Sequence, residues 1–275
     1  IYTMSFSVYR KIANLILLLV ASNLSAQVTY YDAAEFQLLG KATAATTERY
    51  VRLPDSLEHV SRLPLWQLSR NSSGMAVRFR SNSTQVAVKW ESLVNFHMDH
   101  MTDVAVKGLD LYCLEGKNWY FVNSARPIGK STESSLISGM EAKEREFMIY
   151  LPLYDGLVSL SIGIDAGASI NQPAIESPVR EKPVVFYGTS ILQGGCASRP
   201  GMAHTNIISR RLNRECINLG FSGNAFLDLG VAQVMAGVDA GVFVLDFVPN
   251  VTVEQMNERM EKFYRILRDR HPHTP

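Results

Sequence analysis

Apolar and polar positions alternate through the first two thirds of the chain, and this pattern predicts short β-strands. The clearest segments are residues 75–80, 86–90, 108–112, 119–122, 147–151 and 158–164. The polar stretch Ser81–Thr84 predicts a hairpin between the first two segments, and residues 115–118 predict a turn between the next two. Many short strands joined by turns are typical of a β-sandwich or jelly roll. We therefore expect an all-β domain over residues 27–170.

A different pattern begins at Val184, where short, fully apolar runs alternate with helical periodicity. The apolar runs are residues 184–187, 216–219 and 242–247, and they predict strands buried on both faces. Helices are predicted over residues 206–213, with Thr205 as N-cap, over 230–236, and over 253–270, with Thr252 as N-cap. Strands that alternate with helices are typical of a three-layer α/β domain with a parallel sheet. We expect this domain over residues 184–275.

The stretch of residues 171–183 separates the two patterns. It contains three prolines and four charged residues within thirteen positions. Prolines at this density break regular structure, so we interpret the stretch as a linker between two domains.

Polar, turn-forming residues follow each strand of the predicted α/β domain. Ser190 follows the first strand, Gly223 lies shortly after the second, and Asn250 lies shortly after the third. The carboxyl ends of parallel strands meet at one edge of a sheet, where ligands bind in open α/β folds. A hydroxyl, a backbone N–H and an amide at one edge supply a nucleophile and an oxyanion hole. Taken alone, Gly-Thr-Ser would also suit an ordinary turn after a core strand.

The ordered trio of Ser190, Gly223 and Asn250 resembles the first three blocks of the SGNH (GDSL-type) hydrolases. The resemblance implies a flavodoxin-like fold in which Ser190 is the nucleophile. It also implies that the N–H groups of Ser190 and Gly223 and the side chain of Asn250 bind the oxyanion. Residues 108–112, Gly-Leu-Asp-Leu-Tyr, resemble a second signature, that of a β domain found ahead of certain bacterial SGNH hydrolase domains.

Three positions depart from the pattern of the family. Thr189 stands where the first block has aspartate, and Val248 and Val251 replace a glycine and an aspartate of the third block. These departures place the chain in a divergent branch. Leu192 excludes the Gly-x-Ser-x-Gly elbow of the α/β-hydrolases, which needs glycine two residues after the serine.

A serine hydrolase also needs a histidine base held by an acid, which the family supplies from an Asp-x-x-His-Pro block. Asp269-Arg270-His271-Pro272 is one residue too short for that block and follows a helix, which it is expected to end. We therefore expect the catalytic His and Asp beyond residue 275, in a domain that is incomplete here. Three strands are predicted, whereas the family's sheet has about five.

Other histidines and the cysteines carry weaker signals. His204 could line the pocket or be an ordinary loop residue. His97, Asp99 and His100 could bind metal or form an interaction surface, but no third firm ligand is evident. We expect no metal and no organic cofactor. The cysteines, at positions 113, 196 and 216, are interpreted as structural, and their odd number leaves at least one thiol free.

Composition and the N-terminus limit the cellular context. A net charge of +1 gives no electrostatic reason to expect nucleic-acid binding. Residues 1–26 resemble a signal peptide, with Arg10 and Lys11 before an apolar stretch from Ile12 to Val20. That stretch is shorter than the roughly 20 residues that span a bilayer, although a membrane anchor is the competing interpretation. We expect a secreted or periplasmic protein without a stable anchor after cleavage.

The leading hypothesis is therefore a secreted serine esterase that hydrolyses O-acyl, above all O-acetyl, esters on carbohydrates or small molecules. The substrate class follows from the resemblance of the two-domain arrangement to carbohydrate esterases. A lipase or acyltransferase using the same serine is a second hypothesis. A glycan-binding protein with an inert hydrolase domain is a third.

Overall fold

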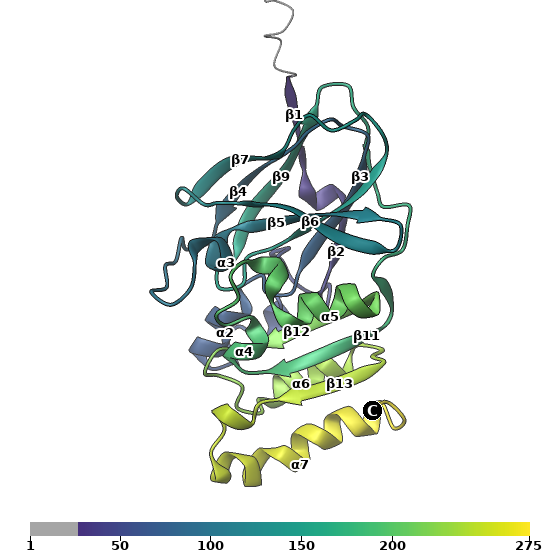
Figure 1. The fold of residues 1–275 in the computed structure, drawn as a ribbon. Coiled ribbons are helices and arrows are strands. Elements are labelled where there is room, and N and C mark those ends of the chain that lie inside the picture. The colour runs from purple at the N-terminus through teal and green to yellow at the C-terminus, as the bar shows by residue number, and fades with distance from the viewer. Residues whose placement is uncertain (1–26) are drawn as a thin grey trace, which may run out of the picture.

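The computed structural model describes residues 27–275, and the predicted signal peptide, residues 1–26, lies outside this range. A β-sandwich forms the N-terminal half, and an α/β unit lies against one end of it (Figure 1). In the described part of the chain, no helix is long and apolar enough to cross a membrane.

Two antiparallel sheets form the sandwich. The first has the order β1 (Val28–Asp32), β9 (Leu157–Asp165), β4 (Val86–Ser92), β7 (Ser131–Ile137). The second has the order β10 (Ile170–Asn171), β3 (Ala76–Ser81), β8 (Arg145–Tyr150), β5 (Leu109–Glu115), β6 (Asn118–Ala125), and β2 (Gln37–Leu39) also pairs with β3. Every predicted strand segment of this half is present, so the two-sheet expectation is confirmed.

The core of the sandwich lies between the inward faces of the two sheets. Phe79 of β3 and Phe147 of β8 stack with ring centroids 5.2 Å apart, and Trp90 and Ile162 reach the same core from the other sheet. Alternation with period two places these apolar side chains on one face of each strand.

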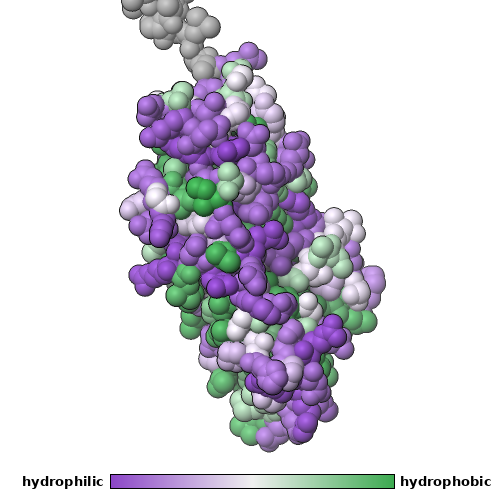
Figure 2. Space-filling view, turned by 90° about the vertical axis from the view of Figure 1, so that its right-hand side faces the viewer, coloured by the Kyte–Doolittle hydropathy of each residue, from purple (hydrophilic) through white to green (hydrophobic). Residues whose placement is uncertain are grey.

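The molecular surface seen in Figure 2 is mostly hydrophilic, with hydrophobic residues in scattered groups, as on ordinary protein surfaces.

The predicted hairpin at Ser81–Thr84 is wrong, because β3 and β4 belong to different sheets. The polar connection crosses from one sheet to the other at the end of the sandwich. There the carboxylate of Asp165 accepts hydrogen bonds from Thr84 N, at 2.7 Å, and from Ser83 Oγ, at 3.0 Å. Both strands face the same core, so their alternation alone could not distinguish adjacent strands from opposing ones. The turn around Gly116, by contrast, does join β5 and β6.

The α/β unit contains a parallel sheet with the order β12 (Arg214–Gly220), β11 (Val179–Gly188), β13 (Val242–Asp246). Its helices are α4 (Ser190–Gln193), α5 (His204–Leu212), α6 (Leu229–Ala236) and α7 (Val253–Arg270). Helix α5 covers one face of the sheet, and α6 and α7 cover the other (Figure 1). The three predicted strands and the three-layer arrangement are therefore present.

The ends of two helices test the predicted N-caps. Thr252 caps α7 as predicted, and Gln255 completes a capping box with it. Helix α5, however, starts at His204 with Ala203 as N-cap, so the predicted cap Thr205 is wrong. Thr205 is buried instead, and its hydroxyl accepts a hydrogen bond of 3.0 Å from Asn218 Nδ2 in the sheet. A tertiary hydrogen bond thus replaces the local cap.

The N-terminal half also contributes to the core of the α/β unit. Leu53 and Leu65 are almost fully buried in one hydrophobic cluster with Tyr187 of the central strand and Phe263 of α7. Leu65 belongs to α2 (Leu63–Ser69), which follows the short 3-10 turn η2 (Asp55–Leu57). The remaining short helical elements are η1 (Ala33–Glu35), α3 (Asp103–Lys107), η3 (Pro200–Met202) and η4 (Val248–Asn250). The two halves therefore share one of their cores.

The predicted linker of residues 171–183 packs against the sandwich. Ser177 Oγ accepts a hydrogen bond of 2.9 Å from Trp119 Nε1, and the carbonyl of Ser177 accepts one from the buried guanidinium of Arg78. Strand β11 already begins at Val179, which pairs with Arg214 of β12. The connection is thus short and fixed at both ends.

Candidate active site

The three predicted site residues lie at the same edge of the parallel sheet. Gly188, near the end of β11, pairs in register with Gly220 of β12 and Asp246 of β13. Ser190 starts helix α4 two residues after Gly188, Gly223 lies three residues beyond Gly220, and Asn250 closes the turn η4. The chain thus brings a hydroxyl, a backbone N–H and an amide to one place.

The turn that carries Ser190 is tightly constrained. A Cβ on Gly188 would lie 2.3 Å from the carbonyl oxygen of Asp246, so only glycine fits this crossing. The carbonyl of Ser190 accepts hydrogen bonds from the N–H groups of Gly194 and Gly195 and, at 3.1 Å, from the hydroxyl of Tyr154. Ser190 remains partly exposed, and within residues 27–275 its N–H has no hydrogen-bond partner. The serine is therefore held at its backbone while its N–H stays free.

The loop after β12 presents a second free N–H group. Gly223 has a left-handed backbone with a φ of 64°, and a Cβ there would meet nothing within 4 Å. Its N–H makes no hydrogen bond to any residue that the structure describes. On the preceding residue, the N–H of Ser222 donates to Oε1 of the fully buried Gln193 at 2.9 Å, which ties this loop to helix α4.

The side chain of Asn250 is oriented by the same loop. Its Oδ1 accepts a hydrogen bond of 3.3 Å from the N–H of Ala225, which leaves Nδ2 without a partner among residues 27–275. Asn250 thus adds an amide donor to the free N–H groups of Ser190 and Gly223. Unpaired donors near a partly exposed hydroxyl can stabilise the negative charge that develops when an ester carbonyl is attacked.

The histidines lie at different places in the fold, and none that the structure describes is hydrogen-bonded to the hydroxyl of Ser190. His204 packs edge to face on Phe186, with ring centroids 6.4 Å apart, and burial lowers its pKa, although Asp246 and a backbone hydrogen bond with Ile191 act in the opposite direction. His271 bonds through Nε2 to the carbonyl of Ala236 at 2.8 Å, before the start of β13 and thus at the opposite edge of the sheet. His271 directly follows α7, as predicted from Asp269–Pro272.

The cluster of His97, Asp99 and His100 divides into two separate pairs. His97 Nδ1 lies 3.0 Å from Asp103 Oδ1, and its Nε2 lies 3.0 Å from the ammonium of the buried Lys107. His100 pairs with Asp99 at 3.0 Å. No group of three or more His, Cys, Asp or Glu side chains in residues 27–275 could hold a metal ion. The three side chains of this cluster therefore do not converge on one point. The three cysteines are free thiols, and only Cys196 is exposed.

A cleft of about 590 Å³ runs beside the loop of residues 220–228, where the sandwich meets the α/β unit. Its walls are mostly apolar, with Tyr154, Ser222 and Asn224 at the end nearest Ser190 and Gly223. Val94 and Phe96 on the sandwich side are 64% and 46% exposed, which leaves apolar surface open to a ligand. Ser190 does not itself line this cleft, but Tyr154, which bonds to the Ser190 carbonyl, and Ser222, the neighbour of Gly223, do. The cleft therefore offers room for a substrate group in the neighbourhood of the candidate site.

Tyr154 contributes a neutral hydroxyl to this region. Burial raises the pKa of Tyr154, whereas a hydrogen bond with Ser222 and the nearby charge of Arg52 lower it in part. A tyrosine is protonated at neutral pH even without such a shift, and this hydroxyl donates to the carbonyl of Ser190.

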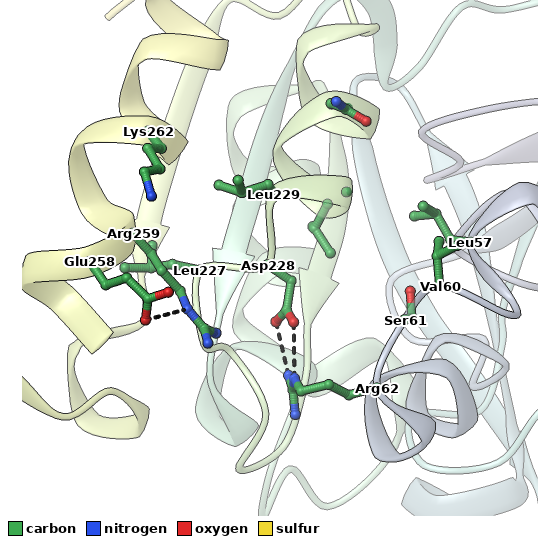
Figure 3. Close-up of a pocket in the computed structure, with 13 residues that line it drawn as sticks. Leu57, Val60, Ser61, Arg62, Leu227, Asp228, Leu229, Glu258, Arg259 and Lys262 are labelled. Carbon is green, nitrogen blue, oxygen red and sulfur yellow. Dashed lines mark hydrogen bonds and ion pairs between the residues drawn. The ribbon is translucent and has the colours of Figure 1, made fainter. Parts of the chain in front are cut away.

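A second pocket, of about 500 Å³, is lined by residues of the segment 57–62, by the end of the loop 220–228 with the start of α6, and by α7 (Figure 3). Arg62, the N-cap residue of α2, forms an ion pair with Asp228, both of whose oxygens lie 2.9 Å from guanidinium nitrogens. Arg259 of α7 points into the same pocket and donates to the carbonyl of Phe226 at 3.1 Å.

The signature of residues 108–112 lies at the contact between the two halves. Asp110 accepts hydrogen bonds of 2.8 Å from Arg199 and from the N–H of Gly201, both in the loop between α4 and α5. A Cβ on Gly201 would lie 2.5 Å from the ring of Tyr112, so the loop packs closely on the signature tyrosine. The signature therefore joins the sandwich to the segment that follows the candidate nucleophile.

Sequence reasoning missed the residues of the N-terminal half that contact the site, namely Arg52, Arg62 and Tyr154. The one available signal was Arg52, a lone cation in the apolar run of residues 50–53. A cation at such a position is buried only when it has fixed acceptors. Arg62 and Tyr154 occupy loop positions that follow no periodic pattern.

Comparison with known proteins agrees with this geometry. Residues 28–170 match the model of the N-terminus of SGNH hydrolase-type esterases, and residues 181–275 match that of the GDSL-like lipase/acylhydrolase family. No curated protein matches the chain.

Three solved structures are similar over most of the chain. A protein of Bacteroides ovatus ATCC 8483 assigned as a GDSL-like lipase is 38% identical, with a TM-score of 0.85, covering 90% of this chain and 73% of its own. The salicylyl-acyltransferase SsfX3 of a tetracycline biosynthetic pathway is 17% identical, with a TM-score of 0.67, covering 92% and 70%. A family two carbohydrate esterase of Cellvibrio japonicus is 10% identical, with a TM-score of 0.55, covering 90% and 77%. The last two likenesses concern the fold.

Proposed function

Since the chain belongs to the GDSL-like lipase/acylhydrolase family and carries the N-terminal domain of SGNH-type esterases, we propose that it is a serine esterase acting through Ser190. The single observation that carries this proposal is the set of three unpaired donors around the serine. These are the N–H groups of Ser190 and Gly223 and the Nδ2 of Asn250.

The reaction follows from this arrangement. The Oγ of Ser190 attacks the ester carbonyl, and the three donors bind the negative oxygen of the tetrahedral intermediate. When the intermediate collapses, the bond to the alcohol oxygen breaks and the acyl group remains on the serine. Water then attacks the acyl-enzyme, and the carboxylic acid is released.

A general base must take the proton of Ser190 and return it to the leaving alcohol. Within residues 27–275, no histidine ring is hydrogen-bonded to the serine hydroxyl. We propose that the catalytic His and Asp belong to an Asp-x-x-His-Pro block outside this range, as the resemblance to the family implies, and we expect residues 27–275 alone to have little activity.

The proposed substrates are O-acyl esters, above all acetyl esters, of carbohydrates or small molecules. The fold shared with a family two carbohydrate esterase and with an acetyl xylan esterase of Butyrivibrio proteoclasticus (12% identical, TM-score 0.54) supports this class. The apolar pattern of residues 12–20 supports secretion or a periplasmic location.

A second candidate is a lipase or acyltransferase that uses the same serine. The specific observation in its favour is the apolar cleft beside Gly223, whose exposed Val94 and Phe96 suit an alkyl or aryl group larger than acetyl. A series of p-nitrophenyl esters of increasing acyl length separates the two, because the first candidate prefers acetate and the second prefers longer chains.

Replacement of the serine tests the proposal. In the full-length protein, Ser190→Ala should abolish hydrolysis of p-nitrophenyl acetate, because the covalent route is lost. Ser135→Ala, at an exposed position in the sandwich, is the matched control and should keep full activity. Equal activity of the wild type and Ser190→Ala would refute the serine mechanism. No activity in the full-length wild type would favour an inert glycan-binding protein.

A further inference from the structure

The oxyanion loop, here residues 220–228, has little regular structure of its own. It contains left-handed residues at Gly223 and Leu227, with φ values of 64° and 58°. It carries the free N–H of Gly223, and its Ala225 N–H orients the amide of Asn250. Two of the three proposed oxyanion donors therefore depend on the position of this loop.

Arg62 contacts the distal part of the loop at several points. Its guanidinium donates to the carbonyl of Asn224 at 2.9 Å, to Oδ1 of Asn224 at 2.8 Å, and to both oxygens of Asp228 at 2.9 Å. It also lies over the ring of Phe226, 4.4 Å from the ring centroid. One planar side chain thus spans residues 224–228, on either side of Ala225 (Figure 3 shows the pair with Asp228).

Arg52 contacts the start of the loop. Its fully buried guanidinium donates to the carbonyl of Gly220 at 2.6 Å and lies 4.7 Å from the centroid of the Phe221 ring. It also donates to the carbonyl of Asn218 in β12 at 3.3 Å, and to the carbonyls of Leu68 and Asn71 at 2.6 and 2.9 Å. Arg52 and Arg62 lie at either end of the same short N-terminal segment, so both ends of the loop are fixed from the other half of the molecule.

We propose that Arg62, assisted by Arg52, is a positioning residue that fixes the oxyanion loop and thereby the donors of Gly223 and Asn250. The N-terminal domain then completes the catalytic geometry, in addition to any role in substrate binding. This inference rests on the function proposed for Ser190. A lysine can replace Arg62 only in part, because its ammonium keeps the positive charge but cannot make the planar, bidentate contacts to Asn224 and Asp228.

The test compares Arg62→Lys, Arg62→Met and Asp228→Asn in the full-length protein. The matched control is Arg80→Met, since Arg80 is an equally half-buried arginine whose ion pair with Glu144 lies within the sandwich. We measure kcat and KM for p-nitrophenyl acetate, and the amide hydrogen exchange of residues 222–228. Exchange reports the order of the loop whether or not the enzyme is active.

We expect Arg62→Met to lower kcat about 10- to 100-fold with KM within about twofold, because a donor displaced by about 1 Å loses much of its effect. Arg62→Lys should be intermediate. Exchange at residues 224–227, whose N–H groups are hydrogen-bonded, should accelerate at least about tenfold in Arg62→Met. Arg80→Met should change neither quantity.

Unchanged kcat and unchanged exchange in Arg62→Met would overturn the inference, as would a change confined to KM, which would make Arg62 a substrate ligand. If Arg62→Met fails to fold, Arg62→Lys and Asp228→Asn decide by the same measurements. Failure of the function proposed for Ser190 can be distinguished from failure of this inference. In the first case Ser190→Ala would retain activity, but the exchange rates would still show whether Arg62 orders the loop.

Discussion

The hydroxyl of Tyr154, in the sandwich, donates a hydrogen bond of 3.1 Å to the backbone carbonyl of Ser190, in the α/β unit. The other end of helix α4 is held from the same side, because Gln193 Nε2 donates to Oδ1 of Asn71 and to the carbonyl of Leu153, at 3.0 and 3.1 Å. A helix of four residues has little stability of its own. The position of the candidate nucleophile therefore depends on the N-terminal half.

Tyr154→Phe should weaken this link while the ring stays in place. Loss of one hydrogen bond, with the Ser190 carbonyl still bonded to two N–H groups, should lower the free energy of unfolding by about 1 kcal/mol. We expect kcat to fall several-fold with KM nearly unchanged, because the serine shifts relative to the oxyanion donors. Urea unfolding and steady-state kinetics of the full-length protein measure both effects.

Tyr120→Phe is the control for this change, since Tyr120 is 52% exposed on β6. It should alter neither stability nor kcat. Full activity of Tyr154→Phe would mean that the hydrogen bond joins the two halves without influencing the serine.

Asn250→Ala should lower kcat by about 10²–10³ with little change in KM, because one oxyanion donor is lost. The side chain makes one long hydrogen bond, of 3.3 Å to Ala225 N, so the cost in stability should be small. Asn257→Ala, at an exposed position on α7, is the matched control and should be neutral. A rise confined to KM would assign Asn250 to substrate binding instead.

The free energy of unfolding should fall in alkaline solution because Tyr150 loses its proton more easily in the unfolded chain than in the folded protein. Burial raises the pKa of Tyr150 to about 12, although the nearby Arg210 acts in the opposite direction. Tyrosine in the unfolded chain titrates near pH 10, so the native state holds this proton longer than the unfolded state does. The stability contribution is therefore complete below about pH 10 and is lost as the pH rises toward 12, by about 1.4 kcal/mol per pH unit for one such group.

Urea midpoints at several pH values between about 8 and 11 check this prediction. Tyr150→Phe should flatten the alkaline decline, in part only, because burial also raises the pKa of Tyr50 to about 12. Tyr120→Phe should leave the decline unchanged. An equally steep decline in Tyr150→Phe would show that another group dominates.

Periodicity predicted the elements of this fold well, because each pattern reflects which face of an element is buried. The strands around Tyr187 and Leu219 and the capped helix from Val253 follow such local rules. The pairing of β3 with β8 rather than with β4 does not follow from local rules. The same alternation of apolar and polar residues suits a neighbouring strand in the sheet and a strand across the core.

The residues of the candidate site also fall into a group that the sequence could predict and a group that it could not. That Ser190, Gly223 and Asn250 lie at one edge could be predicted, because each follows a strand and the carboxyl ends of parallel strands meet. Arg62 and Tyr154 could not, because their partners are main-chain carbonyls and loop residues far away in the sequence. Hydrogen bonds between distant loops leave no periodic trace in a single sequence.

The shared core changes what is expected of the isolated N-terminal half. Its sequence predicts a separate β domain, but Leu53 and Leu65 are buried in the same hydrophobic cluster as Tyr187 and Phe263 of the other half. A fragment of residues 27–175 would expose both leucines and leave the guanidinium of Arg52 without its acceptor on Gly220. We therefore predict that this fragment aggregates or unfolds without a cooperative transition.

Residues 27–275 should instead unfold in one cooperative transition, and Leu65→Ala tests this coupling within them. Leu65 is 1% exposed, so its truncation should cost about 2–5 kcal/mol and lower the Tm of that single transition. Leu63→Ala is the matched control, because Leu63 starts the same helix and is 66% exposed. Calorimetry distinguishes the outcomes, because independent halves would give two transitions, of which Leu65→Ala would shift only one. The single transition follows from the structure, since the sandwich and the parallel sheet cannot separate without opening the core that contains Leu65.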